Sequence, residues 1–146
     1  MSHNQAHLAL RDFKVATQLA PHYIPARHKL GHALLRTNQV DEAVAVYSKV
    51  IEAEPQNAYA YNDRGIALTL RGDYQRALVD FNKSIELDAK YVNALLNRGM
   101  VYVVQGKFDA AVQDFNRVLL LDPDNALAKG KKRELTAKSR QPAMSE

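Results

Sequence analysis

A 34-residue repeat is the feature that most restricts how this chain can fold. The segments 24–57, 58–91 and 92–125 align without gaps. Four columns then repeat: a glycine column (Gly31, Gly65, Gly99), an alanine column (Ala43, Ala77, Ala111), an aromatic column (Tyr47, Phe81, Phe115) and a terminal column (Pro55, Ala89, Pro123). A fixed period of this length predicts a solenoid, in which copies of one small unit stack on one another.

Each repeat is predicted to form two antiparallel helices, called here helix A and helix B. In the second repeat these cover roughly 58–71 and 74–87, and both segments carry apolar residues at helical spacing. A glycine within helix A costs about 1 kcal/mol of helix propensity. We therefore expect the glycine column to pack closely against the alanine column, while the aromatic column fills the gap toward the next repeat. Gly72, Gly106 and Asn38 are expected to adopt the left-handed conformation that ends a helix.

These columns resemble the tetratricopeptide repeat (TPR) family, whose pattern is W-x2-L-G-x2-Y, then A-x3-F, then P. The third repeat matches it with Gly99, Tyr102, Ala111, Phe115 and Pro123. The Leu that precedes the glycine is replaced by Arg64 and Arg98, which leaves the 34-residue register intact. The resemblance implies an all-α fold, a right-handed α-solenoid of antiparallel helix pairs.

The repeat register divides the chain into six segments. We predict a half repeat with one unpaired helix B at 1–23, three full repeats at 24–57, 58–91 and 92–125, a capping helix at 126–138 and a disordered tail at 139–146.

The half repeat has the apolar stripe of a helix B without a helix A before it. Leu10, Phe13 and Ala16 lie on this stripe. Exposed apolar stripes mark contact sites. The chain could be cut from a longer array, another copy of it could cover the stripe, or the helix could dock on the first full repeat. The first two readings are favoured equally over the third, because terminal repeats usually have a polar outer face. Leu10, Phe13 and Ala16 are accordingly our candidate self-association residues.

The resemblance implies that helix A side chains line a concave groove that binds an extended or helical peptide. Carried over column by column, the predicted groove residues are His28, His32, Asn62, Asp63, Ile66, Asn93, Leu96, Asn97, Met100 and Val103. Ile66, Leu96, Met100 and Val103 form an apolar strip, along which amide side chains could donate to and accept from a peptide backbone. The prediction is a protein–protein interaction scaffold. Alternatives are a self-assembly module and the targeting domain of a larger enzyme or complex.

One function of the resembling family is not expected here. Its members that hold acidic chaperone tails use a clamp of Lys, Asn, Asn, Lys and Arg. The corresponding columns read His28, His32, Asp63, Asn93 and Asn97. The cations of the later repeats are missing, and Asp63 would repel a carboxylate. We predict an unidentified protein or peptide partner that is not an acidic chaperone C-terminal tail.

His28 and His32 are four residues apart, a spacing that occurs in zinc sites. Such a site needs a third ligand, and among the other histidines only His22 lies close in sequence. We therefore predict two groove histidines whose protonation makes binding pH-sensitive, with no metal and no cofactor.

Catalysis is not predicted from this sequence. It has no cysteine, and it lacks nucleophile and phosphate-binding motifs. Acidic residues at Asp73, Asp80, Asp109 and Asp114 are expected to cap helices or face solvent.

Charge and hydropathy restrict the environment. No run approaches the ~18 apolar residues of a membrane helix, and no secretory signal is evident at the start, so we expect a cytoplasmic protein that does not enter membranes. The net charge of +4 arises after position 125, where six Lys and Arg stand against two Glu. This basic segment lacks interleaved aromatic residues, so nucleic-acid binding is not expected.

Overall fold

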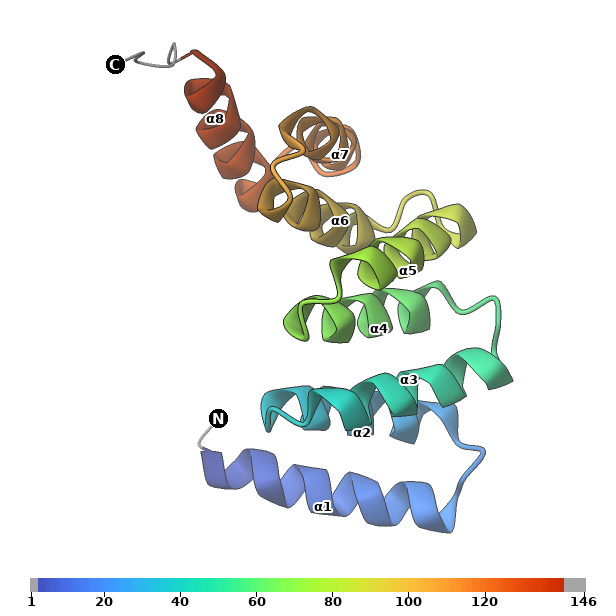
Figure 1. The fold of residues 1–146 in the computed structure, drawn as a ribbon. Helices are drawn as coiled ribbons and strands as arrows, with labels where there is room; N and C mark the ends of the chain where they lie inside the picture. The colour runs from blue at the N-terminus through green and yellow to red at the C-terminus, as the bar shows by residue number, and fades with distance from the viewer. Residues whose placement is uncertain (1–2, 141–146) are drawn as a thin grey trace. The chain divides into compact units, whose positions relative to one another are not determined.

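The computed structural model describes residues 3–140 and is entirely helical within them (Figure 1). The helices are α1 (His3–Leu19), α2 (Ile24–Arg36), α3 (Val40–Ala53), α4 (Ala58–Leu70), α5 (Tyr74–Leu87), α6 (Val92–Val104), α7 (Phe108–Leu121) and α8 (Ala126–Arg140). The chain divides into two compact units, 1–87 and 88–146, of which the first contains α1 to α5 and the second α6 to α8. None of the helices in this described part is long and apolar enough to span a bilayer.

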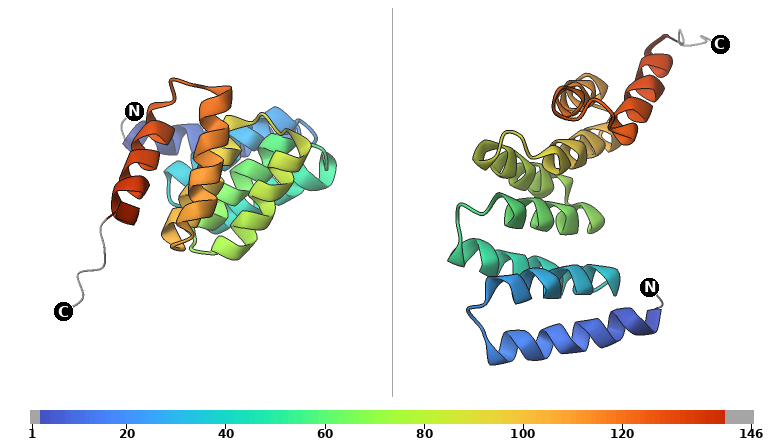
Figure 2. Two further views of the ribbon diagram at one scale, coloured as in Figure 1. Left: turned by 90° about the horizontal axis from the view of Figure 1, so that it is seen from above. Right: turned by 180° about the vertical axis from the view of Figure 1, so that it is seen from behind.

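Each predicted repeat contains the expected helix pair. In the first unit α2 packs on α3 and α4 packs on α5, while α3 also contacts α4. In the second unit α6 packs on α7, and α7 packs on α8. Within each repeat the two helices run antiparallel, as Figure 2 shows from two further directions. The prediction of an all-α fold of antiparallel helix pairs is confirmed.

The turns between the paired helices have the predicted backbone conformation. Gly72 and Gly106 have φ of 82° and 72°, and Asn38 also has a positive φ, at 60°. Asn is among the few residues that tolerate this region. The backbone N–H of the next residue then bonds to a carbonyl five positions earlier, for example Asp73 to Leu68 at 2.9 Å. These bonds satisfy carbonyls that the helix end leaves free.

The glycine column lies against the aromatic column of the same repeat, a contact that was not predicted. A Cβ built on Gly65 would lie 2.7 Å from Cε1 of Phe81, and one on Gly99 would lie 2.9 Å from Cε1 of Phe115. A Cβ built on Gly31 would lie even closer to the ring of Tyr47. The glycine therefore makes room for the aromatic ring of its own repeat, and the residues of the alanine column are fully buried.

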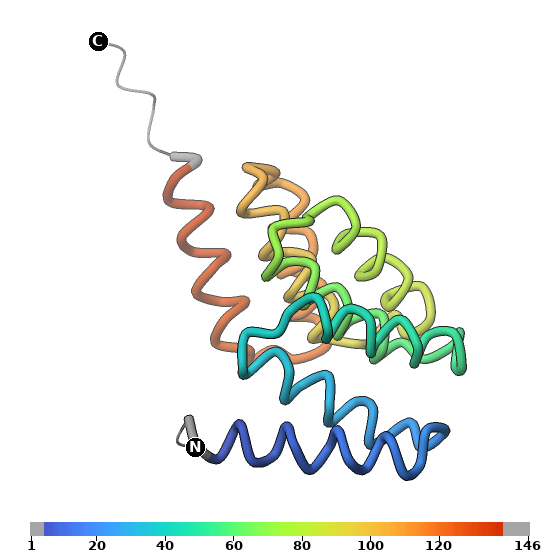
Figure 3. Tube along the Cα trace, turned by 60° about the horizontal axis from the view of Figure 1, so that its bottom comes forward, coloured from blue at the N-terminus to red at the C-terminus, as the bar shows by residue number. Residues whose placement is uncertain are grey.

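The two ends of the described chain also differ from the predictions. Helix α1 lies along α2 (Figure 3) and packs against it, so the half repeat is docked on the first full repeat. The capping helix continues to Arg140, two residues further than expected. Positions 139 and 140, predicted as disordered, are therefore helical, and 141–146 lie outside the described residues.

Candidate functional site

In the second unit, the predicted groove residues lie along α6 as a partly uncovered face. Leu96, Met100 and Val103 are half-buried, and Asn93 is exposed near the start of the helix. Asn97 is half-buried and has polar partners within the structure. This face thus combines apolar side chains that water still reaches with an exposed amide, which suits contact with a peptide.

In the first unit, the predicted residues separate into two groups. His32 is exposed, and His28 and Ile66 are half-buried. Asn62 and Asp63 are only 2% and 7% exposed, so the direct peptide contact predicted for them is not supported. The amide of Asn62 donates to Asp63 Oδ1 over 3.3 Å, so these two buried side chains contact each other.

The two histidines of α2 and the carboxylate of α4 form a cluster, called here the His–His–Asp cluster (His28, His32, Asp63). His28 Nδ1 lies 3.3 Å and His32 Nε2 lies 3.4 Å from Asp63 Oδ2. The predicted histidine pair is therefore joined by a third polar group from the next repeat. This contact was not predicted from the sequence, because Asp63 is distant from the two histidines in the chain. The available signal was that all three residues had been placed on the groove side of helix A in their own repeats.

The electrostatics of this cluster favour its charged form. Its hydrogen bond to Asp63 raises the pKa of His32, although partial burial acts in the opposite direction. Burial alone would raise the pKa of Asp63, but hydrogen bonds and positive charge from the two histidines outweigh it and lower that pKa. Burial also raises the pKa of the neighbouring Tyr47 hydroxyl, and the Asp63 charge adds to this effect.

A cavity of about 220 Å³ opens between α1 and α2. Its apolar lining consists of alanines and Phe13, and its polar lining is basic, with Lys29, His32 and Arg36. Phe13, which was predicted to support self-association, lines this cavity. The arrangement can accept an apolar group that carries negative charge at its edge.

The other predicted self-association residues are also engaged with the first repeat. Leu10 is buried at 7% exposure and Ala16 is half-buried. The stripe therefore faces α2, as in the docking alternative that the sequence favoured least. The apolar residues that α1 exposes are different ones: Leu8, Val15 and Leu19, at 47%, 48% and 82%.

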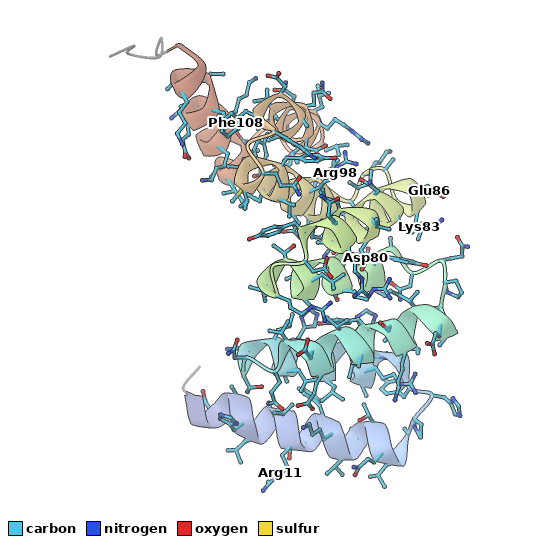
Figure 4. The ribbon with its side chains drawn as sticks, viewed as in Figure 1. Arg11, Asp80, Lys83, Glu86, Arg98 and Phe108 are labelled. Atoms are coloured by element: carbon cyan, nitrogen blue, oxygen red, sulfur yellow. The ribbon has the colours of Figure 1, made fainter. Side chains whose placement is uncertain are left out.

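Two buried ion pairs were not predicted from the sequence. Arg64 Nε and Nη2 donate to the Asp80 carboxylate over 2.7 and 2.8 Å, and Figure 4 shows Asp80 between α4 and α5. Arg98 donates to Asp114 in the same way over 2.8 and 2.6 Å. Asp80 and Asp114 are 3% and 2% exposed, so the expectation that they cap helices or face solvent was wrong. Asp73, in contrast, accepts from the backbone N–H of Arg76 at the start of α5, as a capping residue does.

Comparison with known sequence families gives a consistent assignment. Residues 28–92 match one model described as tetratricopeptide repeat, and residues 92–125 match a second model with the same description. No curated protein sequence matches the chain.

Several solved structures have a similar fold. The first TPR of Spaghetti (RPAP3) bound to the HSP90 peptide SRMEEVD is 25% identical with a TM-score of 0.77, over 81% of this chain and 94% of that one. The second TPR domain of human RPAP3 in complex with the HSP70 peptide SGPTIEEVD is 29% identical with a TM-score of 0.71, over 75% and 92%. MamA is 21% identical with a TM-score of 0.80, over 89% and 76%, and at that identity it shows the fold alone.

Proposed function

Because the chain belongs to the tetratricopeptide repeat family, we propose that it is a non-catalytic binding module that holds a peptide segment of a partner protein against its helix A side chains. The observation that carries this proposal is the partly uncovered apolar face of α6, with Leu96, Met100 and Val103 beside the exposed Asn93. A rigid helix pair presents this face ready-formed, which lowers the ordering cost of binding.

The solved relatives support this mode of binding. TPR domains of RPAP3, 25% and 29% identical to this chain, have been observed with HSP90 and HSP70 peptides that end in EEVD. Similarity at this level supports a peptide as the class of ligand, while the ligand's sequence depends on the side chains present here.

We propose an apolar peptide segment and not an acidic chaperone tail. The α6 face offers apolar contacts and an amide. The two clamp columns that hold Lys and Arg in tail-binding domains hold Asn93 and Asn97 in this chain. In the first unit, Asp63 stands in a clamp column that holds Asn in tail-binding domains. Its lowered pKa keeps this carboxylate negatively charged near neutral pH. A second carboxylate placed beside it would be repelled.

The test compares two charge insertions within the second unit. Met100→Glu places a carboxylate on the α6 face, whereas Leu120→Glu, at a position 82% exposed on α7, is the matched control. Affinity capture from native lysate should lose a partner with Met100→Glu and keep it with Leu120→Glu, while circular dichroism confirms that both variants fold. Fluorescence polarisation should show stronger binding to apolar peptides than to EEVD-terminated ones. Equal capture by both variants, or micromolar affinity for an EEVD peptide, would contradict the proposal.

A second candidate function is self-association through the outer face of α1. Leu8, Val15 and Leu19 are exposed there, which supports an apolar contact surface. Light scattering during size-exclusion chromatography should then show a mass that increases with concentration and returns to the monomer in Val15→Asp. A monomer mass at every concentration would argue against this function.

A further inference from the structure

We propose that His28, His32 and Asp63 form a binding site for a divalent transition-metal ion of the zinc class, which joins α2 to α4. Each of these residues offers one ligand atom, and the three atoms all lie within 4.8 Å of one another. The site is independent of the peptide-binding function proposed above.

The spacing of the ligand atoms agrees with tetrahedral coordination. Zinc binds imidazole nitrogen and carboxylate oxygen at about 2.0–2.2 Å, and two ligand atoms of a tetrahedron with such bonds are about 3.3–3.6 Å apart. The distances from Asp63 Oδ2 to His28 Nδ1 and His32 Nε2 are 3.3 and 3.4 Å. Two of the three ligand–ligand distances therefore already match those around a bound ion, and the third is at most 4.8 Å.

The choice of ligands also indicates the class of metal. Two imidazoles with one carboxylate suit zinc and its neighbours in the first transition series, and do not suit calcium or magnesium, which prefer oxygen. Three protein ligands leave a fourth coordination position. The side chain of His32 is 58% exposed, so that position can open toward solvent and accept water or a donor group from a bound molecule.

A surrounding contact orients the carboxylate for this role. Asn62 Nδ2 donates to Asp63 Oδ1, while Asp63 Oδ2 faces the two histidines. One oxygen is thereby held by the protein and the other is directed at the site, as is typical of carboxylates that bind metals. Asn62 is buried although it lies in a predicted groove column.

The cluster is specific to the first two repeats. One repeat further along the chain, the columns of His28, His32 and Asp63 hold Asn62, Ile66 and Asn97, which cannot bind zinc as a set. The aromatic column differs at the same place, since Tyr47 stands where Phe81 and Phe115 follow.

The hydroxyl of Tyr47 is a second observation that supports a polar ligand beside the His–His–Asp cluster. It is buried without a hydrogen-bond partner, and buried polar groups are usually satisfied. The Tyr47 ring lies 6.2 and 6.0 Å from the rings of His28 and His32. A metal-bound water would bring a polar partner into this neighbourhood.

The experiment uses the whole chain after EDTA treatment and dialysis at pH 7.5, with ZnCl₂ as the probe. Isothermal titration calorimetry should give one zinc per chain, and Co²⁺ in its place should give the visible absorption of tetrahedral coordination. His32→Gln and Asp63→Asn should each weaken zinc binding by at least about 100-fold, since loss of a supporting group alone costs 10–100-fold. His32→Gln alters an exposed side chain, so it keeps the test valid should Asp63→Asn fail to fold.

The matched control is His7→Gln, which removes an exposed histidine on α1. It should bind zinc as tightly as the unaltered chain. Absence of stoichiometric zinc binding would overturn the proposal, and so would loss of binding in His7→Gln with retention in His32→Gln, which would indicate a surface site on α1. Zinc should also raise the melting temperature of the unaltered chain and leave that of His32→Gln unchanged. An equal shift in both would count against the site.

Discussion

Arg64 in α4 and Asp80 in α5 face each other one residue before the contact between Gly65 and Phe81, and two hydrogen bonds of 2.7 and 2.8 Å join their side chains. Both pairs are separated by sixteen residues, as are Arg98 and Asp114. A residue of helix A thus meets the residue sixteen positions later in helix B. In the first repeat the Arg–Asp position is occupied by Leu30 and Val46, so an apolar pair stands where the later repeats have an ion pair.

Removing one member of the buried pair should be costly. Arg64→Ala leaves Asp80, which is 3% exposed, without its charge partner, and we expect the free energy of unfolding to fall by about 3–5 kcal/mol. Urea denaturation monitored by circular dichroism measures the loss. Arg11→Ala is the control, because the Arg11 and Asp12 side chains are 74% and 70% exposed, and it should change stability by less than about 0.5 kcal/mol.

Exchanging both members for the pair of the first repeat should be tolerated. A double variant with Arg64→Leu and Asp80→Val removes both buried charges and introduces apolar contact, so its stability should lie within about 1 kcal/mol of the unaltered chain. The same urea titration tests this recovery. If the double variant is as unstable as Arg64→Ala, the ion pair itself is needed and the apolar Leu–Val pair of the first repeat cannot replace it.

The sequence predicted the helices and their turns because those depend on features that recur along the chain. The period located the helix pairs, and Gly72, Gly106 and Asn38 marked the left-handed turns correctly. It did not reveal which columns face each other, since that depends on how each helix is rotated about its axis. The contact of the glycine column with the aromatic rings was for this reason not predicted.

The candidate site was predicted less completely than the fold. The polarity of Asp80 and Asp114 suggested exposure, whereas their partners stand sixteen residues earlier in the sequence and keep them buried. One signal was available in the sequence: the columns of Leu30 and Val46 change together to Arg and Asp in both later repeats, which indicates an ion pair between the two columns. Similarly, Asp63 was recognised as a groove residue, but its contact with His28 and His32 depends on the stacking of α2 and α4, which a single sequence does not specify.

The close contact at the glycine column predicts opposite effects for two alanine substitutions. Gly65→Ala places a Cβ 2.7 Å from the ring of the buried Phe81 and should destabilise the fold by about 1–3 kcal/mol. Gly130 lies inside α8 with no atom within 4 Å of such a Cβ, so Gly130→Ala should stabilise by up to about 1 kcal/mol. Thermal and urea unfolding of the two variants test this contrast. A stable Gly65→Ala would mean that the ring can move aside.

The turn after α4 should depend on backbone conformation alone. Gly72 has φ of 82° and no atom near a built Cβ, so Gly72→Ala should cost about 1–2 kcal/mol through strain in the left-handed region. Gly72→Asn should lower the free energy of unfolding by clearly less, because Asn38 adopts φ of 60° in the corresponding turn of the first repeat. Urea denaturation of both variants compares them directly. Equal losses would show that the turn needs glycine for another reason.

Protonation of His32 should make the first unit more stable in mild acid when metal is removed with EDTA. The pKa of His32 is raised in the fold by Asp63, so its contribution is complete below its unfolded pKa of about 6.5 and is lost as pH rises through the folded value. The pKa of Asp63 is lowered, so its contribution is present above about 4 and is lost as pH falls through the folded value. The pair therefore stabilises most between roughly pH 4 and 6.5.

The measurement is the difference in unfolding free energy between the unaltered chain and His32→Gln at pH 5.5 and pH 8.5. His28, Asp63 and Tyr47 face the same site and remain in both proteins, so the difference reports His32 together with its effect on Asp63. The difference in unfolding free energy should favour the unaltered chain at pH 5.5 by no more than about 1 kcal/mol, because solvent screens the exposed His32 side chain. This difference should shrink at pH 8.5. A difference that grows with pH would contradict the assigned direction of the His32 pKa shift.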